Sequence, residues 1–267
     1  MQRLIVVFIV LMLCGFICGN LLAVESTDLM AYWSFDKDGG KTVSDDSGNQ
    51  HEGKVINCTW EKSGKYGGTM SFKGTGDYVE VANDPTLSPG QDDWTIELWI
   101  KRSDIADNDW QKIITKYAGA WTGYRLGLNP GTSGIHCIFG EGEASKVEFI
   151  TTTQIKDTEW HHIAAVFDRK ADAVIYIDGK ADVTTASIKS IKNVSLDKTV
   201  DIGRCWWCGG GATMGFKGFI DEIRLWRFAL TKADVALAID GKLLTKLAVS
   251  PSQSMPIMWG KIKSDHL

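Results

Sequence analysis

The chain has 267 residues, of which 44% are hydrophobic and 23% are charged, as in ordinary globular proteins. Its 28 glycines and 5 prolines exclude a collagen-like or proline-rich chain. A formal net charge of −4 argues against a nucleic-acid-binding protein, which would carry a basic surface. The chain also contains 11 tryptophans, and its length suits a single all-β domain.

The first 23 residues have the pattern of a secretory signal peptide. Arg3 supplies a positive charge, and the segment Leu4 to Cys18 is apolar apart from Gly15. This segment is shorter than the roughly 20 residues that a membrane span needs, and Ala23 offers a cleavage position. We therefore expect residues 1–23 to be removed and the remainder to be secreted, periplasmic or on the cell surface. The alternatives are cleavage near Gly19 and retention of the segment as an anchor. No later segment is long and apolar enough to span a membrane.

From residue 28 to about residue 227, apolar and polar residues alternate with the period of two that predicts β-strands. In Trp94–Lys101, the even-numbered positions are apolar, and the odd-numbered positions form a partly polar face that we expect to be exposed. No helical pattern of 10–15 residues separates the strands, which excludes Rossmann and TIM-barrel folds. The predicted strands are Leu29–Phe35, Tyr78–Val81, Trp94–Lys101, Lys112–Tyr117, Tyr124–Leu128, Ile135–Phe139, Val147–Thr151, His161–Phe167, Ala173–Ile177, Thr199–Ile202 and Phe219–Trp226.

One helix follows the last predicted strand. Thr231 is a suitable N-cap for Lys232–Ile239, and Gly241 can end the helix. Beyond it, Leu243–Leu267 mixes polar residues with two prolines and is predicted to be a tail of low order. The predicted organisation is therefore a signal peptide (1–23), one β domain (24–230), and a short helix with a tail (231–267).

Several short motifs follow one another along the chain: Leu29–Asp36, Asp45–Asn49, Gly76–Val79, Trp94–Trp99, Trp160–Ala164, Tyr176–Gly179 and Gly218–Arg224. They occur in the order found in laminin-G-like, concanavalin A-like jelly-roll domains of secreted bacterial proteins, which the chain resembles over residues 28–230. The resemblance implies two antiparallel sheets packed face to face, with the first and last strands adjacent. It also implies a module that binds glycans or proteins, often with a structural calcium ion.

The resemblance favours a calcium site built from Asp36, Asp45, Asn49 and Asp221. Calcium takes six to eight oxygen ligands, and Asp45–Asn49 offers several on a loop. If the first and last strands pair, Asp36 and Asp221 approach the same end of the sandwich. The alternative is a loop stabilised by its own hydrogen bonds, with Asp221 hydrogen-bonded or solvated.

The tryptophans fall into two groups. Those within strand patterns (Trp33, Trp94, Trp99, Trp160 and Trp226) are predicted to be core residues. Trp206 and Trp207 lie outside a strand and precede three glycines, so they are candidates for stacking on a sugar. Trp110, Trp121 and Tyr124, with Tyr117 nearby, form a second candidate group. The alternative is that these rings only cover the ends of the sandwich.

Four cysteines remain after the signal peptide, in an export compartment that favours disulfides. They are Cys58, Cys137, Cys205 and Cys208. Three pairings are possible. One of them joins Cys205 to Cys208 and Cys58 to Cys137, and the sequence does not choose among the three.

Catalytic motifs are weak. His161 and His162 are consecutive on a strand and face opposite ways, as do Asp221 and Glu222. No Glu is followed two residues later by Asp, so the carboxylate motif of the laminarinase-type relatives is missing. We therefore predict a non-catalytic, carbohydrate-binding module with structural Ca²⁺. The alternatives are a module that binds an extracellular or cell-surface protein and, with least support, a glycan-cleaving enzyme.

Overall fold

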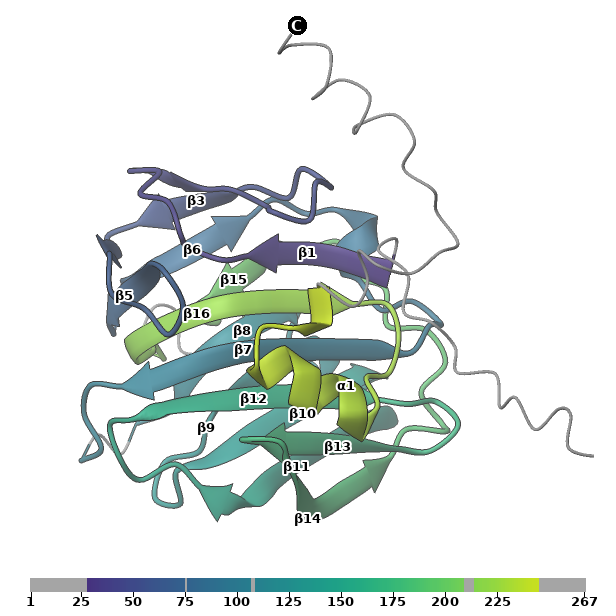
Figure 1. The fold of residues 1–267 in the computed structure, drawn as a ribbon. Coiled ribbons are helices and arrows are strands. Elements are labelled where there is room, and N and C mark those ends of the chain that lie inside the picture. Colours follow the sequence, from purple (N-terminus) through teal and green to yellow (C-terminus); the bar gives the residue numbers. More distant parts are fainter. Residues whose placement is uncertain (1–27, 75, 107–108, 209–213, 245–267) are drawn as a thin grey trace, which may run out of the picture.

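The computed structural model describes residues 28–74, 76–106, 109–208 and 214–244. They form two antiparallel sheets packed face to face, with one helix lying against the outside of one sheet (Figure 1). This is the predicted jelly-roll sandwich. The predicted signal peptide and nearly all of the predicted tail lie outside the described residues.

The two sheets contain eight strands each. The front sheet in Figure 1 has the order β14 (Lys180–Ser187), β13 (Asp172–Ile177), β12 (Trp160–Phe167), β7 (Trp94–Arg102), β16 (Lys217–Trp226), β5 (Thr69–Lys73), β4 (Thr59–Glu61), with β1 (Leu29–Trp33) also paired to β16. The back sheet has the order β11 (Ser145–Gln154), β10 (Gly134–Gly142), β9 (Thr122–Leu128), β8 (Gln111–Tyr117), β15 (Val200–Ile202), β6 (Tyr78–Val81), β3 (Gly53–Ile56), β2 (Thr42–Val43).

The core lies between the sheets and is made by the inward positions of both. Phe139 of the back sheet stacks on Phe167 of the front sheet, with ring centroids 4.2 Å apart. Trp94 of the front sheet meets Tyr124 of the back sheet at 6.3 Å. Full burial of such side chains stabilises the fold by roughly 1.5–3 kcal/mol each. Because alternate residues of every long strand contribute, the alternation that predicted the strands also explains why the sheets pack.

All eleven predicted strands are present, with small shifts at their ends. The predicted pairing of the first and last strands is confirmed, since Trp33 lies opposite Ile223 in an antiparallel ladder between β1 and β16. Five strands were not predicted: β2, β3, β4, β5 and β14. Three of these have four residues or fewer, so a period-two pattern has few positions in which to appear.

One expectation about β7 is wrong. Its odd-numbered face was expected to be exposed, but Thr95 and Glu97 are fully buried. Trp99 on the same face is 4% exposed, which confirms its separate prediction as a core residue. The segment before the helix covers Thr95, whose hydroxyl donates to the carbonyl of Phe228 at 2.8 Å. A loop at residues 62–68 covers Trp99, which Tyr66 meets edge-on at 6.2 Å. The outer face of the front sheet is therefore a second, partly polar interior.

The predicted helix is confirmed as α1 (Lys232–Ile239). Thr231 and Asp234 form a reciprocal capping box at its start. The helix packs against the front sheet through Val235 and Ala238, which join the buried side chain of Trp226. Although the sequence suggested a boundary at residue 231, α1 is thus continuous with the domain's hydrophobic packing. A short 3-10 helix, η3 (Pro85–Leu87), links β6 to β7.

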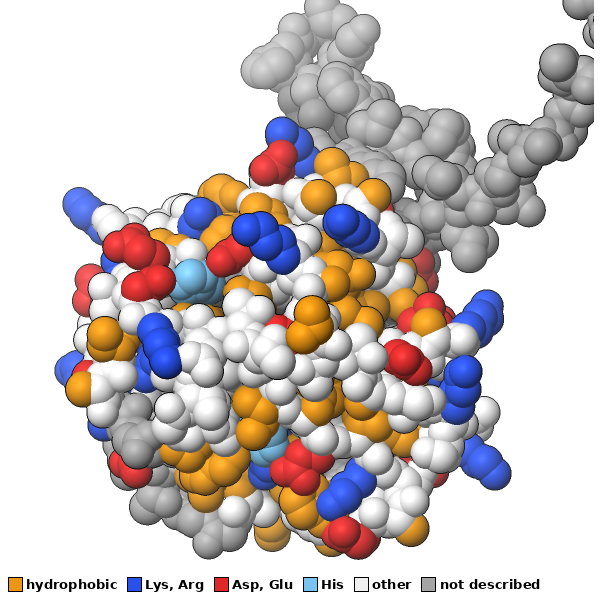
Figure 2. Space-filling view, turned by 90° about the horizontal axis from the view of Figure 1, so that it is seen from below, with side chains coloured by type: hydrophobic (Ala, Val, Ile, Leu, Met, Phe, Trp, Pro, Cys, Tyr) orange, Lys and Arg blue, Asp and Glu red, His pale blue; other side chains and the backbone are white. Residues whose placement is uncertain are grey.

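Seen from the lower side of Figure 1, side chains of both charges are interspersed with small groups of hydrophobic side chains (Figure 2). Neither charge dominates this face. Within the described ranges, no helix has the length and apolar character needed to cross a membrane.

Candidate functional site

The disulfide loop at Cys205–Cys208 presents two exposed indoles on the outer face of the back sheet. The structure joins Cys205 to Cys208, in a four-residue ring that directly follows the strand β15 and Gly203–Arg204. Trp206 and Trp207 lie inside this ring and are 51% and 45% exposed. By contrast, Trp33, Trp94 and Trp226 are fully buried. A ring this small leaves little room for two adjacent indoles to turn inward.

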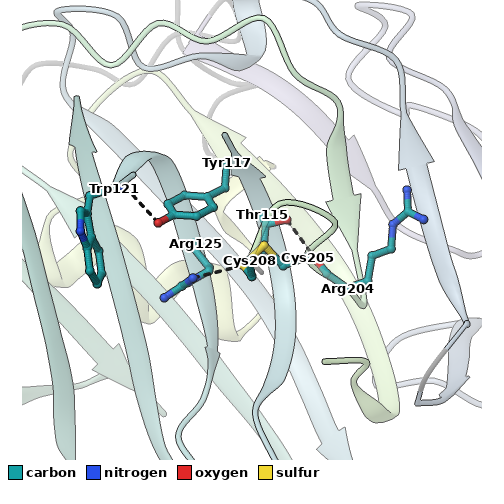
Figure 3. Close-up of a disulfide and its surroundings, with 7 residues drawn as sticks. All are labelled: Thr115, Tyr117, Trp121, Arg125, Arg204, Cys205 and Cys208. Carbon is teal, nitrogen blue, oxygen red and sulfur yellow. Dashed lines mark hydrogen bonds between the residues drawn. A yellow bond between two sulfur atoms is a disulfide. The ribbon is translucent and has the colours of Figure 1, made fainter. Parts of the chain in front are cut away.

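The loop is attached to the sheet beneath it on two sides. Thr115 of β8 donates its hydroxyl hydrogen to the carbonyl of Arg204 at 3.1 Å. On the other side, Arg125 Nη1 donates to Cys208 Sγ at 3.1 Å (Figure 3). Figure 3 also shows Tyr117 and Trp121 beyond Arg125, on the side of the disulfide opposite Arg204. The disulfide therefore separates two groups of polar and aromatic residues.

The first group lines a cavity of about 500 Å³, which we call the Trp110 pocket. This volume is within the range of roughly 300–1,000 Å³ for small-molecule sites. Among the residues that line it are the half-buried rings of two tryptophans that the sequence singled out. Trp110 stacks obliquely on His136 with centroids 4.8 Å apart, and Lys146 Nζ lies 3.2 Å from the ring centroid of Trp121. The pocket is lined by Trp110, Lys112, Tyr117, Gly119, Ala120, Trp121, Arg125, His136, Glu148, Trp207, Cys208 and Met214.

Four polar residues of this pocket were missed by the sequence reasoning: Lys112, Arg125, His136 and Glu148. They come from the four neighbouring strands β8, β9, β10 and β11. Cross-strand register places them together. Gly127 lies opposite both Lys112 and His136, and Ile138 lies opposite both Arg125 and Glu148. In the sequence, each of these residues is marked only by interrupting the apolar pattern of its strand. Their proximity depends on the register between strands, which the sequence of a single strand does not show.

Burial and mutual repulsion shape the charges in the Trp110 pocket. The pKa of Lys112 is lowered to about 7, mainly because burial disfavours the ammonium form and also because Arg125 is near. The pKa of His136 is lowered to about 3 by burial, Lys112 and Arg125. His136 is therefore neutral at pH 7, and its Nε2–H donates to Glu148 Oε1 at 2.9 Å.

The second group lines a cavity of about 420 Å³ on the other side of Trp207, which we call the Arg204 pocket. Its charges are matched. Arg204 Nη2 lies 2.8 Å from Glu80 and 3.1 Å from Asp201, and its guanidinium stacks 3.2 Å from the centroid of Tyr78. Trp207 belongs to both pockets, so it is the residue through which a ligand could contact the two together.

The prediction that Tyr124 contacts a ligand is wrong. Its side chain is fully buried, and its hydroxyl donates to the carbonyl of Leu87 at 3.2 Å. On β9, Tyr124, Leu126 and Leu128 point into the core, whereas Arg125 points out to the Trp110 pocket. Tyr124 alternates in phase with Leu126 and Leu128 along β9, so its side chain points inward as theirs do.

The possible pairing of Cys58 with Cys137 is also wrong, since both are free thiols. Cys137 lies on β10 and Cys58 follows β3, five strand positions away in the back sheet. At ~4.8 Å per strand, this separation is roughly 24 Å. A disulfide needs Cα atoms within about 7 Å of each other.

Asp45 and Asn49, two of the four predicted calcium ligands, stabilise their own loop. The Asp45 carboxylate accepts hydrogen bonds from the backbone N–H groups of Tyr32, Ser47 and His51 at 2.9–3.0 Å. Asn49 Nδ2 donates to the carbonyls of Leu29 and Met30 at 2.8 and 3.0 Å. These hydrogen bonds tie the loop to β1, as in the alternative considered for it.

The other two predicted ligands, Asp36 and Asp221, contact one and the same loop. Asp36 Oδ1 accepts from Gly68 N at 3.2 Å, and Asp221 Oδ2 accepts from Lys65 N at 2.8 Å. Asp221 is fully buried, and burial raises its pKa to about 8. No described residue donates a hydrogen bond to its Oδ1. In the part of the chain that the structure describes, no three His, Cys, Asp or Glu side chains are grouped so that they could hold a metal ion. Calcium binding stays a prediction.

Asp221 and Glu222 do not face opposite ways, as their adjacency had suggested. Glu222 has a φ of 56°, and the register of β16 against β7 shifts between Asp221 and Arg224. This bulge turns both carboxylates to the outer side of the front sheet. Glu222 accepts from the hydroxyl of Tyr32 at 3.0 Å and from Arg224, so it belongs to the buried polar layer rather than to a cavity.

Comparison with known proteins agrees with this architecture. The pattern of the concanavalin A-like lectin/glucanase superfamily matches residues 73–236. A search of curated proteins found no match.

Solved structures resemble this chain at low sequence identity, so they show the fold alone. The binding domain of Paraclostridial Mosquitocidal Protein 1 is 15% identical with a TM-score of 0.66, and the alignment covers 81% of this chain and 52% of that one. The botulinum neurotoxin serotype D ligand-binding domain in complex with N-acetylneuraminic acid is 16% identical with a TM-score of 0.63, covering 82% and 52%. Domain 4 of the arabinanase AbnA from Geobacillus stearothermophilus, in complex with arabinotriose, is 19% identical with a TM-score of 0.59, covering 78% and 97%.

This chain thus spans about half the length of the toxin domains and nearly all of the arabinanase domain. The family match covers more than half of this chain, and the structure has the corresponding two-sheet sandwich with its first and last strands paired. The chain belongs to the concanavalin A-like lectin/glucanase superfamily.

Proposed function

We propose that this protein is an exported, non-catalytic carbohydrate-binding module whose ligand surface is the disulfide loop and the two pockets beside it. The observation that carries the proposal is the exposure of Trp206 and Trp207, 51% and 45%, on a cross-linked loop between two cavities. Sugar rings present apolar C–H faces that stack on flat aromatic surfaces. Holding two indoles in a closed ring reduces the entropy that a ligand must overcome on binding.

The known structures support this reading without deciding it. Two proteins of the same fold have been solved with sugars, N-acetylneuraminic acid in one and arabinotriose in the other. Both are below 20% identity, so neither identifies the sugar that this chain binds.

The test is binding to a broad glycan panel, followed by calorimetry with the best ligand. We expect the double variant Trp206→Ala/Trp207→Ala to lose at least about tenfold in affinity, since central aromatic contacts contribute 2 kcal/mol or more at hot spots. Val183→Ala is the matched control, because Val183 is 83% exposed but lies on β14 of the other sheet. A panel that shows no binding, or equal affinity of the double variant, contradicts the proposal.

A protein-interaction or adhesion module is the second candidate, because exposed indoles also serve as hot spots for protein partners. The toxin neighbours include domains described as receptor-binding. A partner that is captured from the cell envelope by the natural protein, resists deglycosylation and is lost with the double variant would favour this candidate over glycan binding.

Calcium and export complete the proposal. Asp36 and Asp221 contact the same loop, and the unpartnered Asp221 Oδ1 is an oxygen that a cation would satisfy. A calcium ion bound only to the folded protein would raise its melting temperature, and excess chelator would lower it. An unchanged melting curve in chelator contradicts the calcium part.

Export and the lack of catalysis are tested separately. For export, N-terminal sequencing of the mature protein should begin at Val24. For the non-catalytic role, purified protein should release no sugar from polysaccharides.

A further inference from the structure

Lys112 is a buried cation on the wall of the Trp110 pocket. Its side chain is 1% exposed. The stem crosses the bare Cα of Gly127, where a Cβ would lie 3.1 Å from Lys112 Cδ, so glycine leaves the path open toward the pocket. Nζ then lies 4.1 Å from the ring centroid of Trp110. Within the described ranges, the ammonium group makes no hydrogen bond and no ion pair.

Lys116, four residues further along β8, shows how the same strand accommodates another buried lysine. It is also 1% exposed, but its Nζ donates to Asn83 Oδ1 at 2.7 Å and to the carbonyl of Lys198. Removing an ammonium from water without replacing its hydrogen bonds is costly. For Lys116 these acceptors recover part of that cost, and burial lowers its pKa only to about 8. Lys112 has no such acceptor among the described residues, and its pKa falls further, to about 7.

Arg125 is a second under-used cation in the same pocket. Among the described residues, its buried Nε has no hydrogen-bond partner, and Nη1 donates to the sulfur of Cys208. Its guanidinium lies 4.9 Å from the ring centroid of Tyr117. Because sulfur is a weak acceptor, the terminal nitrogens of this guanidinium keep donor capacity for a ligand.

The charges of the pocket do not cancel. Among the described lining residues, two basic side chains, Lys112 and Arg125, face one carboxylate, Glu148, whose acceptor capacity is partly taken by the neutral His136 at 2.9 Å. In the neighbouring pocket, by contrast, Arg204 is paired with both Glu80 and Asp201. A protein with a formal net charge of −4 therefore has a locally cationic, aromatic-walled cavity beside its exposed indoles.

Resting on the proposed glycan-binding function, we propose that the Trp110 pocket selects an anionic sugar, a ring that carries a carboxylate or a sulfate. The tryptophan rings would face the sugar ring, and Lys112 and Arg125 would hold the acidic group. A charged hydrogen bond in such a site is stronger than a neutral one, and arginine and lysine are the side chains that bind such anions.

The experiment compares oligosaccharides that differ in charge. The probes are tetragalacturonate, its fully methyl-esterified form, and a sulfated galactan tetrasaccharide without carboxylates. Esterification removes the charge and keeps the ring, so we expect at least about tenfold weaker binding of the ester. The carboxylate and sulfate arms show which acidic group the pocket prefers.

Two variants locate the effect. Lys112→Met should reduce affinity for the anionic oligosaccharide about tenfold or more and leave affinity for the ester unchanged. Arg125→Gln should act in the same direction. Lys54→Met is the matched control, since Lys54 is an exposed cation on β3 outside the pocket. Three results would overturn the selection for anionic sugars and leave glycan binding intact. They are equal affinity for the acid and its ester, binding of neutral glycans alone, and an unchanged affinity of both variants for the anionic oligosaccharide. No binding of any glycan would overturn the proposed function itself.

Discussion

Replacing Lys112 by methionine should stabilise the ligand-free protein at neutral pH. Methionine keeps the length and apolar contacts of the lysine stem and removes the buried charge. The pKa of Lys112 falls from 10.5 in a solvated chain to about 7 in the folded protein. At about 1.4 kcal/mol per pKa unit, this shift corresponds to a destabilisation of roughly 4 to 5 kcal/mol when the solution is below both pKa values.

The pH dependence of that gain has a definite sign. Between pH 7 and pH 10.5 the unfolded chain holds a proton on Lys112 that the folded protein has lost, so the stability of the natural protein rises with pH in this window. Methionine does not titrate. The advantage of the variant should therefore be largest near pH 6.5 and shrink by roughly 3 kcal/mol by pH 9.5.

The assay is urea unfolding of both proteins at these two pH values, in a buffer of weakly binding anions. Lys116→Met serves as the control on the same strand. Because burial lowers the pKa of Lys116 only to about 8, and because the variant leaves Asn83 Oδ1 and the carbonyl of Lys198 without their donor, Lys116→Met should gain less stability at pH 6.5 than Lys112→Met. If Lys112→Met were no more stable than the natural protein at pH 6.5, or if the difference did not change with pH, the ammonium would have a partner and the reasoning would be refuted.

Three further predictions concern stability. Reducing the Cys205–Cys208 disulfide should lower the free energy of unfolding by only about 2 kcal/mol in calorimetry, because the ring is short. Glycan affinity should fall more strongly, and equal affinity in reductant would contradict the role given to the loop. Thr231→Ala removes the capping box of α1 and should cost about 1 kcal/mol in urea unfolding, and a neutral effect would mean that the cap is dispensable. The pKa of His161 is raised to about 9, chiefly by its hydrogen bond to Asp178. This stabilisation is complete below pH 6.5 and is lost as pH rises through 9. His161→Gln should therefore destabilise the fold at pH 6 and not at pH 10, and the loss at pH 6 should be smaller in high salt, since Asp178 is 45% exposed. A pH-independent loss would rule out the ion pair.

Much of the scaffold was accessible from local patterns. Period-two alternation located eleven of the sixteen strands, and capping chemistry located α1 together with its first and last residues. These features depend on neighbours close in sequence, so the sequence is enough to predict them. The short strands β2, β3 and β4 were missed because their pairing partners, rather than their own two to four residues, make them strands.

The candidate site was only partly accessible. Exposure of Trp206 and Trp207 could be predicted because they lie outside a strand and precede three glycines, whereas the Cys205–Cys208 pairing was one of three possibilities. The direction of Tyr124 could also have been predicted, because it alternates in phase with Leu126 and Leu128 within the predicted strand. The cations of the Trp110 pocket could not, because their proximity depends on the register of separate strands.

What the sequence alone determined is therefore eleven of the sixteen strands, the terminal helix and the loop that carries the indoles. Tertiary structure alone decided that the segment before α1 and the loop at residues 62–68 bury the polar side of β7, and that a bulge at Glu222 turns two adjacent carboxylates the same way. It also decided that Lys112, Arg125, His136 and Glu148 meet on four neighbouring strands. The reason is that alternation assigns a residue to one side of its own strand. Which side becomes covered, and what lies opposite, depends on contacts between segments far apart in the chain.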